Sequence, residues 1–440
     1  MTGNPLYDPY QILMKVYAEK AYLKQAIADT YIEEAYRSRT VKTVYGVLEN
    51  DAYLSFCISH YAEKSPKLPV RVLLKTALYF LIFLEKKRYA VTDFAVELCK
   101  KLGKGGAAGF VNAFLRKFNE EEVKKALPAG KKGVIIATSY PEFAYDLLHK
   151  EYGSRAEKIA AAKSAGVSVR FLDSSGKIAE GTQNGNVIEK AISAEQNAAP
   201  YLEKADGGAI KTPFYGGYIF KNFARDRAYD EGKYTFQSVG SQAICDVIAP
   251  CGKLLDACAA PGGKSVLLSE KCGEITSFEL HEHRAELIEA YAKRTGRKNI
   301  RVCVKDSREY DAAYEQAFDA VLCDVPCSGY GTVSENPDIK VLKDESVFSS
   351  LAEDQRRILD TCSAYVKEGG MLYYSTCSLF RRENDAVVAE FLKNHVGFTP
   401  VGIFSPLAHE KKKYGLQFLP DTAYGAGFYV AAMRKGEKTE

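Results

Sequence analysis

The sequence predicts a multidomain protein: an all-α domain first, a small α+β connecting domain next, and a carboxyl-terminal α/β domain built on a doubly wound parallel sheet. Apolar residues recur at helical spacing through residues 1–120, which predicts helices with short connections. Signals are mixed in the middle of the chain, and beyond it strand-like apolar runs alternate regularly with helical patterns. The expected domains are residues 1–130, 131–236 and 237–440, each long enough to bury its own core.

The amino-terminal domain is predicted from its apolar spacing. Residues 12–17 and 72–80 place their apolar side chains on helical faces, and a further helix is expected over residues 107–118, after the glycines at 103–106. The charged stretch at 119–132, which contains a Pro-Ala-Gly turn, is the expected linker.

Charge is uneven along the chain. The net charge is +4, but residues 1–150 carry 23 Lys and Arg against 16 Asp and Glu, which is +7 and leaves −3 for the remainder. A positive amino-terminal third favours a polyanionic partner. The excess is modest. Alone it is weak evidence for such a partner, because solvated faces of helical domains are often rich in lysine.

Composition favours a cytoplasmic protein without a metal site. The first ten residues contain no apolar signal core, and the longest apolar stretch, residues 76–84, is far shorter than a membrane span. Nine of the 11 cysteines lie between residues 245 and 377, yet no CxxC pair occurs, so no zinc site is indicated. Buried, reduced thiols account for most of these cysteines.

The middle and last domains are predicted from strand-like runs. The middle domain is expected to contain strands at residues 167–171 and 217–220. Helices expected at 282–294 and 351–366 lie among the strands of the last domain, and this alternation implies right-handed crossovers in a parallel sheet. Its strands are expected at residues 254–257, 274–280, 300–304, 320–324, 371–374 and, near the end, 427–431.

A glycine-rich turn, residues 256–264, follows the first strand of the last domain. Its two glycines precede a helix and would let backbone amides approach a ligand closely. A nucleoside triphosphate is one candidate ligand, because the turn ends like a Walker A loop and residues 321–324 imitate Walker B. That match fails at the first glycine position, which is Cys258, and Pro261 stiffens a loop that must wrap phosphates.

S-adenosylmethionine is the second candidate ligand, since it has no phosphate and needs only close backbone approach and an acid for its ribose hydroxyls. Glu279 ends the next strand, 23 residues after Asp256, where nucleoside-binding sheets carry that carboxylate. Asp306 follows the third strand and is placed to accept from the adenine amino group. Each acid alone could be a solvated loop residue or a helix cap, but three acids and a glycine turn at successive strand ends favour a cofactor site.

Two thiols follow strands at the same predicted edge. Cys327 and Cys377 have proline, serine or glycine neighbours, which predicts loop positions. A lone loop thiol is usually inert, but two at one edge favour function. Pyrimidine C5 becomes nucleophilic once a thiolate adds at C6, so we expect covalent methyl transfer to that atom. Asp324 could hydrogen-bond ring N3, and the second thiol could assist loss of the C5 proton. The target base must leave any helical stack to reach such a site.

On these residues the chain resembles the RNA cytosine-C5 methyltransferases, and within them the bacterial 16S ribosomal RNA cytosine-C5 methyltransferase B subfamily. Its first domain is similar to that subfamily's helical domain, which is related to the antitermination factor NusB. The phrases that carry the resemblance are residues 256–264, 324–329 with 337–340, 375–378 with 383–384, and 109–116 in the first domain.

The resemblance implies a NusB-like RNA-binding domain and a Rossmann-like catalytic domain that uses S-adenosylmethionine. It implies RNA as the partner, small-subunit rRNA first, with no membrane and no metal, and a monomer. It also implies the catalytic residues: Cys377 as the attacking thiolate, Cys327 as the thiol that assists product release, and Asp324. Spacing alone leaves the order of the two thiols open. The implied cofactor-binding residues are Cys258, Ala259, Ala260, Pro261, Gly262, Gly263, Lys264, Glu279, Asp306 and Asp324.

The chain departs from the family at three places. The acid after the second strand is Glu279 rather than Asp, and Val325 stands where the family often has Ala. Ser334, Glu335 and Asn336 occupy the stretch where an Arg-Arg pair commonly stands, so RNA phosphates would be gripped differently.

Two other functions remain as alternatives. The first is a tRNA cytosine-C5 methyltransferase, and the NusB-like domain favours rRNA over it. The second is a non-catalytic RNA-binding or ribosome assembly factor, which the intact Cys327, Cys377 and Asp324 disfavour.

Overall fold

The chain divides by its internal contacts into two compact units in the computed structural model, which describes residues 3–173, 184–205 and 208–437. The first unit is Met1–Ala161 with Val333–Glu345, and the second is Ala162–Thr332 with Ser346–Glu440. Of the region expected to form the connecting domain, residues 131–161 therefore fall in the first unit and residues 162–236 in the second. The three-domain boundaries at 130 and 236 stay a prediction.

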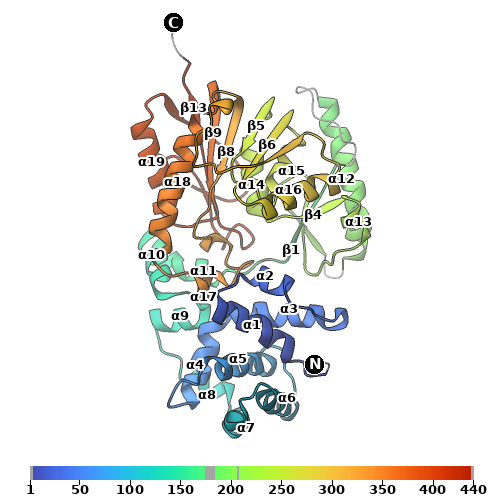
Figure 1. Cartoon of the computed structure of the whole chain (residues 1–440), viewed down its shortest axis with the longest axis vertical. Helices are drawn as coiled ribbons and strands as arrows, with labels where there is room; N and C mark the ends of the chain where they lie inside the picture. Colours follow the sequence, from blue (N-terminus) through green and yellow to red (C-terminus); the bar gives the residue numbers. More distant parts are fainter. Residues whose placement is uncertain (1–2, 174–183, 206–207, 438–440) are drawn as a thin grey trace. The chain divides into compact units, whose positions relative to one another are not determined.

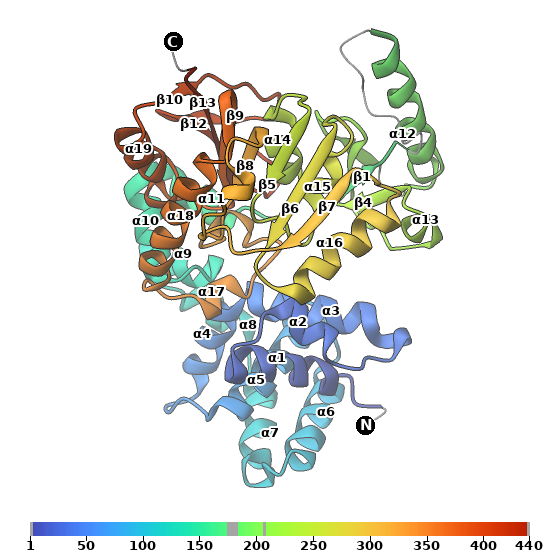
Figure 2. The same ribbon diagram turned by 45° about the horizontal axis from the view of Figure 1, so that its top comes forward.

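The first unit is helical, as the apolar spacing predicts (Figures 1 and 2). Its central helix is α5 (Leu68–Ile82), which begins with a proline in its first turn and buries every residue from 72 to 80. The expected helix near residue 110 is confirmed as α7 (Ala108–Lys117). The expected linker instead contains α8 (Glu120–Lys125), because the Asn119 side chain caps it by accepting a hydrogen bond from a backbone N–H.

Further α-helices make up the rest of this unit. They are α1 (Tyr7–Glu19), α2 (Leu23–Ala28), α3 (Glu34–Glu49), α4 (Asp51–Tyr61), α6 (Arg88–Lys101), α9 (Lys131–Thr138), α10 (Glu142–Tyr152) and α11 (Ala156–Ala161).

A segment from far along the chain completes the helical unit. Val333–Glu345, which contains α17 (Ile339–Leu342), comes from the connection between two strands of the second unit. The Asp338 carboxylate accepts a hydrogen bond from the backbone N–H of Leu23, the first residue of α2, at 3.0 Å. Lys340 Nζ donates to the carbonyl oxygen of Thr138 at 2.8 Å. The phrase at 337–340 is therefore part of the helical unit.

The smaller sheet of the second unit is antiparallel, in the order β2-β3-β1-β4. Both strands expected in this region, β1 (Val167–Phe171) and β3 (Gly217–Phe220), are confirmed. They pair with β4 (Tyr234–Phe236) and β2 (Ala209–Lys211). Helix α12 (Asn184–Lys204) contributes Ala194 and Ala198 to the aromatic core beside this sheet.

The larger sheet has nine strands, in the order β11-β12-β13-β9-β8-β5-β6-β7, with β10 beside β13. The neighbouring strands β9, β8, β5, β6 and β7 are parallel to one another, as expected. Strand β13, however, pairs antiparallel with β9. The sheet is therefore mixed, and the expected strand near the end extends it in the opposite direction. The strands are β5 (Lys253–Asp256), β6 (Glu274–Glu279), β7 (Ile300–Val304), β8 (Phe318–Asp324), β9 (Val366–Thr376), β10 (Phe398–Val401), β11 (Glu410–Lys411), β12 (Gly415–Phe418) and β13 (Phe428–Lys435).

Successive residues of the central strands enter two different cores, because side chains alternate across a sheet. On one face Leu254 and Leu322 pack with residues of α14 (Val239–Val247), and on the other Leu255 and Val321 pack with residues of α18 (Val347–Ser363) and α19 (Asp385–Asn394). Helices thus cover both faces of the sheet. No helix in the described part of the chain is long and apolar enough to cross a bilayer.

Candidate active site

The sheet reverses its strand order between β5 and β8. Strand β5 lies between β6, which follows it in the chain, and β8, which comes two strands later. The helices that follow such neighbouring strands diverge, and the carboxyl edge at this point is where ligands bind in open α/β sheets. The predicted loops all start from this edge: the glycine-rich turn after β5, and the two thiol loops after β8 and β9.

A buried hydrogen-bond chain fixes the start of the glycine-rich turn. Ser265 Oγ donates to Asp256 Oδ2 at 2.7 Å, and Ser277 Oγ donates to Ser265 Oγ at 2.9 Å. All three side chains are buried. Burial raises the pKa of Asp256 to about 6, although the hydrogen bond from Ser265 works against that rise. Asp256 therefore anchors the loop from below.

The turn brings backbone close to helix α16 (Glu282–Arg294). Gly262, at φ 101°, is the residue before α15 (Gly263–Leu268), and a Cβ added there would lie 3.1 Å from Ile288 Cα. Only glycine fits this backbone and this space. The chain can thus present backbone amides to a ligand without a side chain between them.

Glu279 is placed to accept hydroxyl groups. Its side chain ends β6, is buried, and accepts from the His281 N–H at 3.2 Å, while Arg284 Nη1 lies 3.3 Å from the same oxygen, Oε1. Oε2 has no partner among the described residues, so it can accept from a ribose. These features fit S-adenosylmethionine, with backbone from the turn and a carboxylate for the sugar.

Asp306 is held by a neighbour that the sequence did not indicate. Arg308 donates to both Asp306 oxygens, with Nη2 to Oδ2 at 2.8 Å and Nε to Oδ1 at 3.0 Å, and its Nη1 reaches Asp354 Oδ1 on α18 at 2.8 Å. The Arg308 hydrogen bonds hold the pKa of Asp306 below its usual value. Asp306 is therefore an ionised acceptor whose orientation Arg308 fixes.

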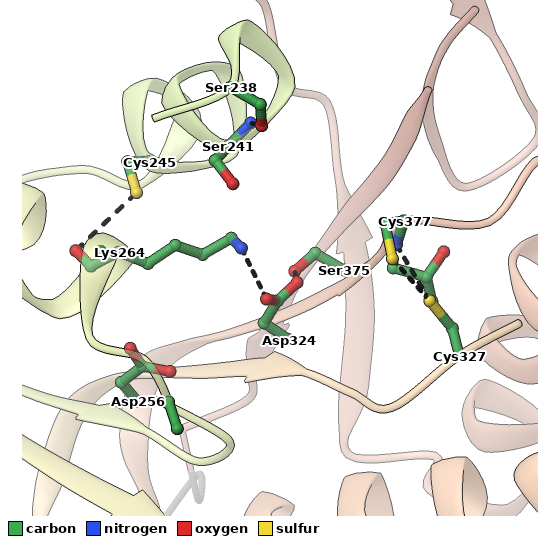
Figure 3. A network of polar contacts seen from close by, with 12 residues as sticks. Ser238, Ser241, Cys245, Asp256, Lys264, Asp324, Cys327, Ser375 and Cys377 are labelled. Carbon is green, nitrogen blue, oxygen red and sulfur yellow. Dashed lines mark hydrogen bonds and ion pairs between the residues drawn. The ribbon is translucent and has the colours of Figure 1, made fainter. Parts of the chain in front are cut away.

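Lys264 joins the turn to the strand that carries the first thiol loop (Figure 3). Its Nζ lies 2.6 Å from Asp324 Oδ2, and Ser375 Oγ donates to Asp324 Oδ1 at 2.6 Å. Burial works to lower the pKa of Lys264, but the charge and hydrogen bond of Asp324 outweigh it and raise that pKa above its usual value. A phosphate-binding turn would need this lysine for the phosphates. The ion pair with Asp324 therefore disfavours a nucleoside triphosphate as the ligand of the turn.

The two thiols are in contact. Cys327 Sγ and Cys377 Sγ lie 3.0 Å apart, and the backbone N–H of Cys377 donates to Cys327 Sγ at 3.2 Å (Figure 3). They follow adjacent parallel strands, where Asp324 of β8 stands opposite Ser375 of β9. The register explains the contact, because each cysteine comes a few residues after this pair.

Sequence reasoning missed the residues that hold these loops. Ser375 binds Asp324, and the buried Gln355, Glu383 and Asn384 bind the residues around the thiols. Ser375, Glu383 and Asn384 gave a signal as parts of family phrases, but nothing in those phrases stated their contacts, and Gln355 gave none. Within the described residues, no group of three His, Cys, Asp or Glu side chains is placed to hold a metal ion.

Known proteins resemble this chain in both of its parts. The family model described as 16S rRNA methyltransferase RsmB/F matches residues 249–434, and the NusB family model matches residues 10–120. The predicted methyltransferase and NusB-like regions are confirmed by these matches.

Whole-chain similarities agree with the family models. The chain is 31% identical to the probable ribosomal RNA small subunit methyltransferase B of Bacillus subtilis (strain 168), over 97% of each protein. It is 27% identical to the ribosomal RNA small subunit methyltransferase B of Xanthomonas campestris pv. campestris, over 83% of this chain and 80% of the relative. The crystal structure of PH0851 shares the fold, with a TM-score of 0.77 and 22% identity over 99% of this chain and 100% of that one. The chain belongs to the 16S rRNA methyltransferase RsmB/F family and carries a NusB-family region toward its amino terminus.

Proposed function

We propose that the enzyme transfers a methyl group from S-adenosylmethionine to C5 of a cytidine in 16S rRNA, through a covalent bond between a cysteine and C6. Family membership gives methylation of small-subunit rRNA; the base, the atom and the covalent route are the proposal. The observation that carries it is the 3.0 Å contact between Cys327 Sγ and Cys377 Sγ at the ends of adjacent strands. Two thiols in contact can reach neighbouring atoms of one pyrimidine ring.

In the proposed reaction Cys377 is the nucleophile. Its thiolate forms a bond to C6, and the electrons of the C5–C6 double bond shift toward C5 and the ring. The Lys264–Asp324 pair lies beside the ring in this proposal and shares a proton with ring N3 as negative charge develops on the ring. C5 then takes the methyl group as the bond between that group and the cofactor sulfur breaks, with the electron pair of that bond staying on the sulfur. The Cys327 thiolate takes the C5 proton, the electrons of that C–H bond restore the C5–C6 double bond, and Cys377 leaves C6 as a thiolate with the electron pair of the broken bond.

The cofactor-binding residues in this proposal are Cys258–Lys264, Glu279, Asp306 and Asp324. When bound, S-adenosylmethionine supplies a methyl group on a positively charged sulfur. Backbone of the turn approaches it closely, and the free oxygen of Glu279 accepts from the ribose. Asp306, fixed by Arg308, accepts from the adenine amino group.

The test compares three cysteine variants on transcribed 16S rRNA with labelled S-adenosylmethionine. We expect wild type to form C5-methylcytosine, Cys377→Ala to lose at least about 10³-fold in rate, and Cys327→Ala to accumulate a denaturant-resistant RNA adduct. Cys251→Ala is the matched control, because Cys251 and Cys272 form another pair of close sulfurs, 3.4 Å apart, away from the thiol loops. It should methylate like wild type.

Other outcomes point elsewhere. An adduct trapped only with Cys377→Ala would reverse the roles of the thiols. Methylation of tRNA but not of rRNA would support the transfer RNA alternative, and RNA binding with no methylation of any RNA would support an assembly factor. We further propose that the enzyme acts in the cytoplasm as a monomer, so sedimentation equilibrium should give a mass near 48.6 kDa, and a doubled mass would contradict it.

A further inference from the structure

We infer that the buried carboxylate of Glu383, together with Asn384 and Gln355, is the device that fixes the two thiols relative to each other. These are positioning residues, since they act on substrate only through the cysteine loops. The inference rests on the proposed function, in which both thiols must meet adjacent atoms of one base.

Glu383 joins the residues that directly follow the two cysteines. It lies in the 3-10 turn Arg381–Glu383 after the second thiol loop, and its side chain is 0% exposed. Its Oε1 accepts from the backbone N–H of Ser328 at 2.7 Å, and its Oε2 accepts from Ser328 Oγ at 2.5 Å and from Ser378 Oγ. Ser328 follows Cys327 and Ser378 follows Cys377, so one carboxylate links both loops.

The residues on the other side of each cysteine are held as well. Gln355 Nε2, from helix α18, donates to the carbonyl oxygen of Pro326 at 2.9 Å and to Glu383 Oε1 at 3.2 Å. Thr376 Oγ1 donates to Asn384 Oδ1 at 2.6 Å, and Asn384 Nδ2 donates to the Ser378 carbonyl oxygen at 3.1 Å. Each cysteine is thereby flanked on both sides by residues bound to one network.

A carboxylate suits this task. When ionised it only accepts, and it offers lone pairs enough for an amide N–H, two hydroxyls and a side-chain amide at once. Hydrogen bonds to a charged acceptor are short and strong, so the loops they hold are rigid. All four donors are neutral, and burying an acid without a cation is unfavourable. The buried acid is kept despite this cost because the site must hold two sulfurs in place to within about 0.5 Å.

The test is Glu383→Gln, which keeps the shape but replaces one acceptor oxygen by a donor that faces other donors. We expect kcat to fall about 10- to 100-fold with KM for RNA nearly unchanged, because misplacing reacting groups affects the chemical step. Iodoacetamide should also alkylate Cys327 and Cys377 in a changed ratio in the RNA-free protein. Glu390→Gln is the matched control, since Glu390 pairs with Arg356 at the surface of the same unit, and it should change neither readout.

Two milder variants keep the inference testable if Glu383→Gln folds poorly. Ser328→Ala and Ser378→Ala each remove one hydroxyl, and each should chiefly alter the alkylation of the cysteine beside it. The inference is overturned if Glu383→Gln keeps wild-type kcat and alkylation, or if kcat falls only as far as the folded fraction does. Because alkylation needs no RNA, it still reports on this network even if wild type forms no C5-methylcytosine, an outcome that would refute the proposed function instead.

Discussion

The Lys264 side chain runs from the cofactor turn to Asp324, and the two side chains are only 14% and 21% exposed. Removing one partner of such a pair leaves the other charge uncompensated. We expect Lys264→Met to lower the free energy of unfolding by about 3 kcal/mol and to abolish methylation. Urea denaturation and a methylation assay measure both effects.

The matched control is Lys211→Met. Lys211 pairs with Glu195 at 3.2 Å, but the two side chains are 63% and 58% exposed. Lys211→Met should therefore lower the free energy of unfolding by less than about 1 kcal/mol. Equal losses in the two variants would show that burial of the Lys264–Asp324 pair contributes nothing.

Asp256 makes stability depend on pH in a defined window. Burial raises its pKa from 3.8 to about 6, so between these values the folded chain holds a proton that the unfolded chain has lost. Stability from this group is therefore fully present below about pH 4 and is lost as pH rises to about 6. We expect the free energy of unfolding of wild type to fall relative to Asp256→Asn across this window, by on the order of 3 kcal/mol. Urea titrations from pH 4 to pH 8 measure the difference, and parallel curves would contradict it.

At this scale the sequence indicated the candidate site residues more clearly than the residues that hold them in place. The turn at Cys258–Lys264, Asp324 and both cysteines each lie in a short local phrase, and the structure brings Lys264, Asp324 and the thiols to one edge. The supports could not be predicted, because Glu383 binds Ser328 across 55 positions and Arg308 reaches Asp354 across 46. Such pairs depend on how strands and helices pack.

Among the elements, the turn into α15 depends most sharply on one residue. Gly262→Ala places a Cβ 3.1 Å from Ile288 Cα at a φ of 101°, so helix α16 must shift or the turn must open. We expect the free energy of unfolding to fall by about 2–4 kcal/mol, because the cost of a positive φ adds to that of overpacking. We also expect weaker binding of S-adenosylmethionine. Denaturation and isothermal titration calorimetry measure the two effects.

Gly296→Ala separates the two causes. Gly296 also has a positive φ, 68°, but a Cβ there meets nothing within 4 Å. Gly296→Ala should lower the free energy of unfolding only by the cost of the positive φ, about 1–2 kcal/mol, and should bind the cofactor like wild type. If both variants behaved alike, the close approach to Ile288 would have no effect.

Element types were predictable where periodicity was strong. Strand β7 and helix α16 match their expected ranges, and β8 and β9 start earlier than their apolar runs suggest. Strands β11 and β12 were missed because they are only 2 and 4 residues long, too short for alternation to show.

On the scale of the whole chain, reading along the sequence gives no sign that a segment from late in the chain belongs to the helical unit. Val333–Glu345 lies between β8 and β9 in the sequence, yet it belongs to the helical unit, where Val341 and Leu342 pack against the core. No composition change marks this excursion. The three departures from the family include residues 334–336, which the structure also assigns to the helical unit.

This excursion predicts a stabilising role for Asp338. Asp338→Ala leaves the N–H of Leu23 without its carboxylate partner, so we expect the free energy of unfolding of the helical unit to fall by about 1–2 kcal/mol. Glu345→Ala, an exposed acid at the end of the same segment, is the control and should change it by less than about 0.5 kcal/mol. Hydrogen exchange of α2 amides reports the loss locally. An unchanged exchange rate in Asp338→Ala would contradict the role.

The same segment also orders events during synthesis. The helical unit has made its continuous part once residue 161 has been translated, but its last piece begins only at residue 333. At about 5–20 residues per second, a ribosome needs roughly 9–34 s to travel from residue 161 to residue 333. Until then the binding surface for α17 stays open while strands of the other unit emerge. The helical unit of this rRNA-modifying enzyme is therefore completed late in its own translation.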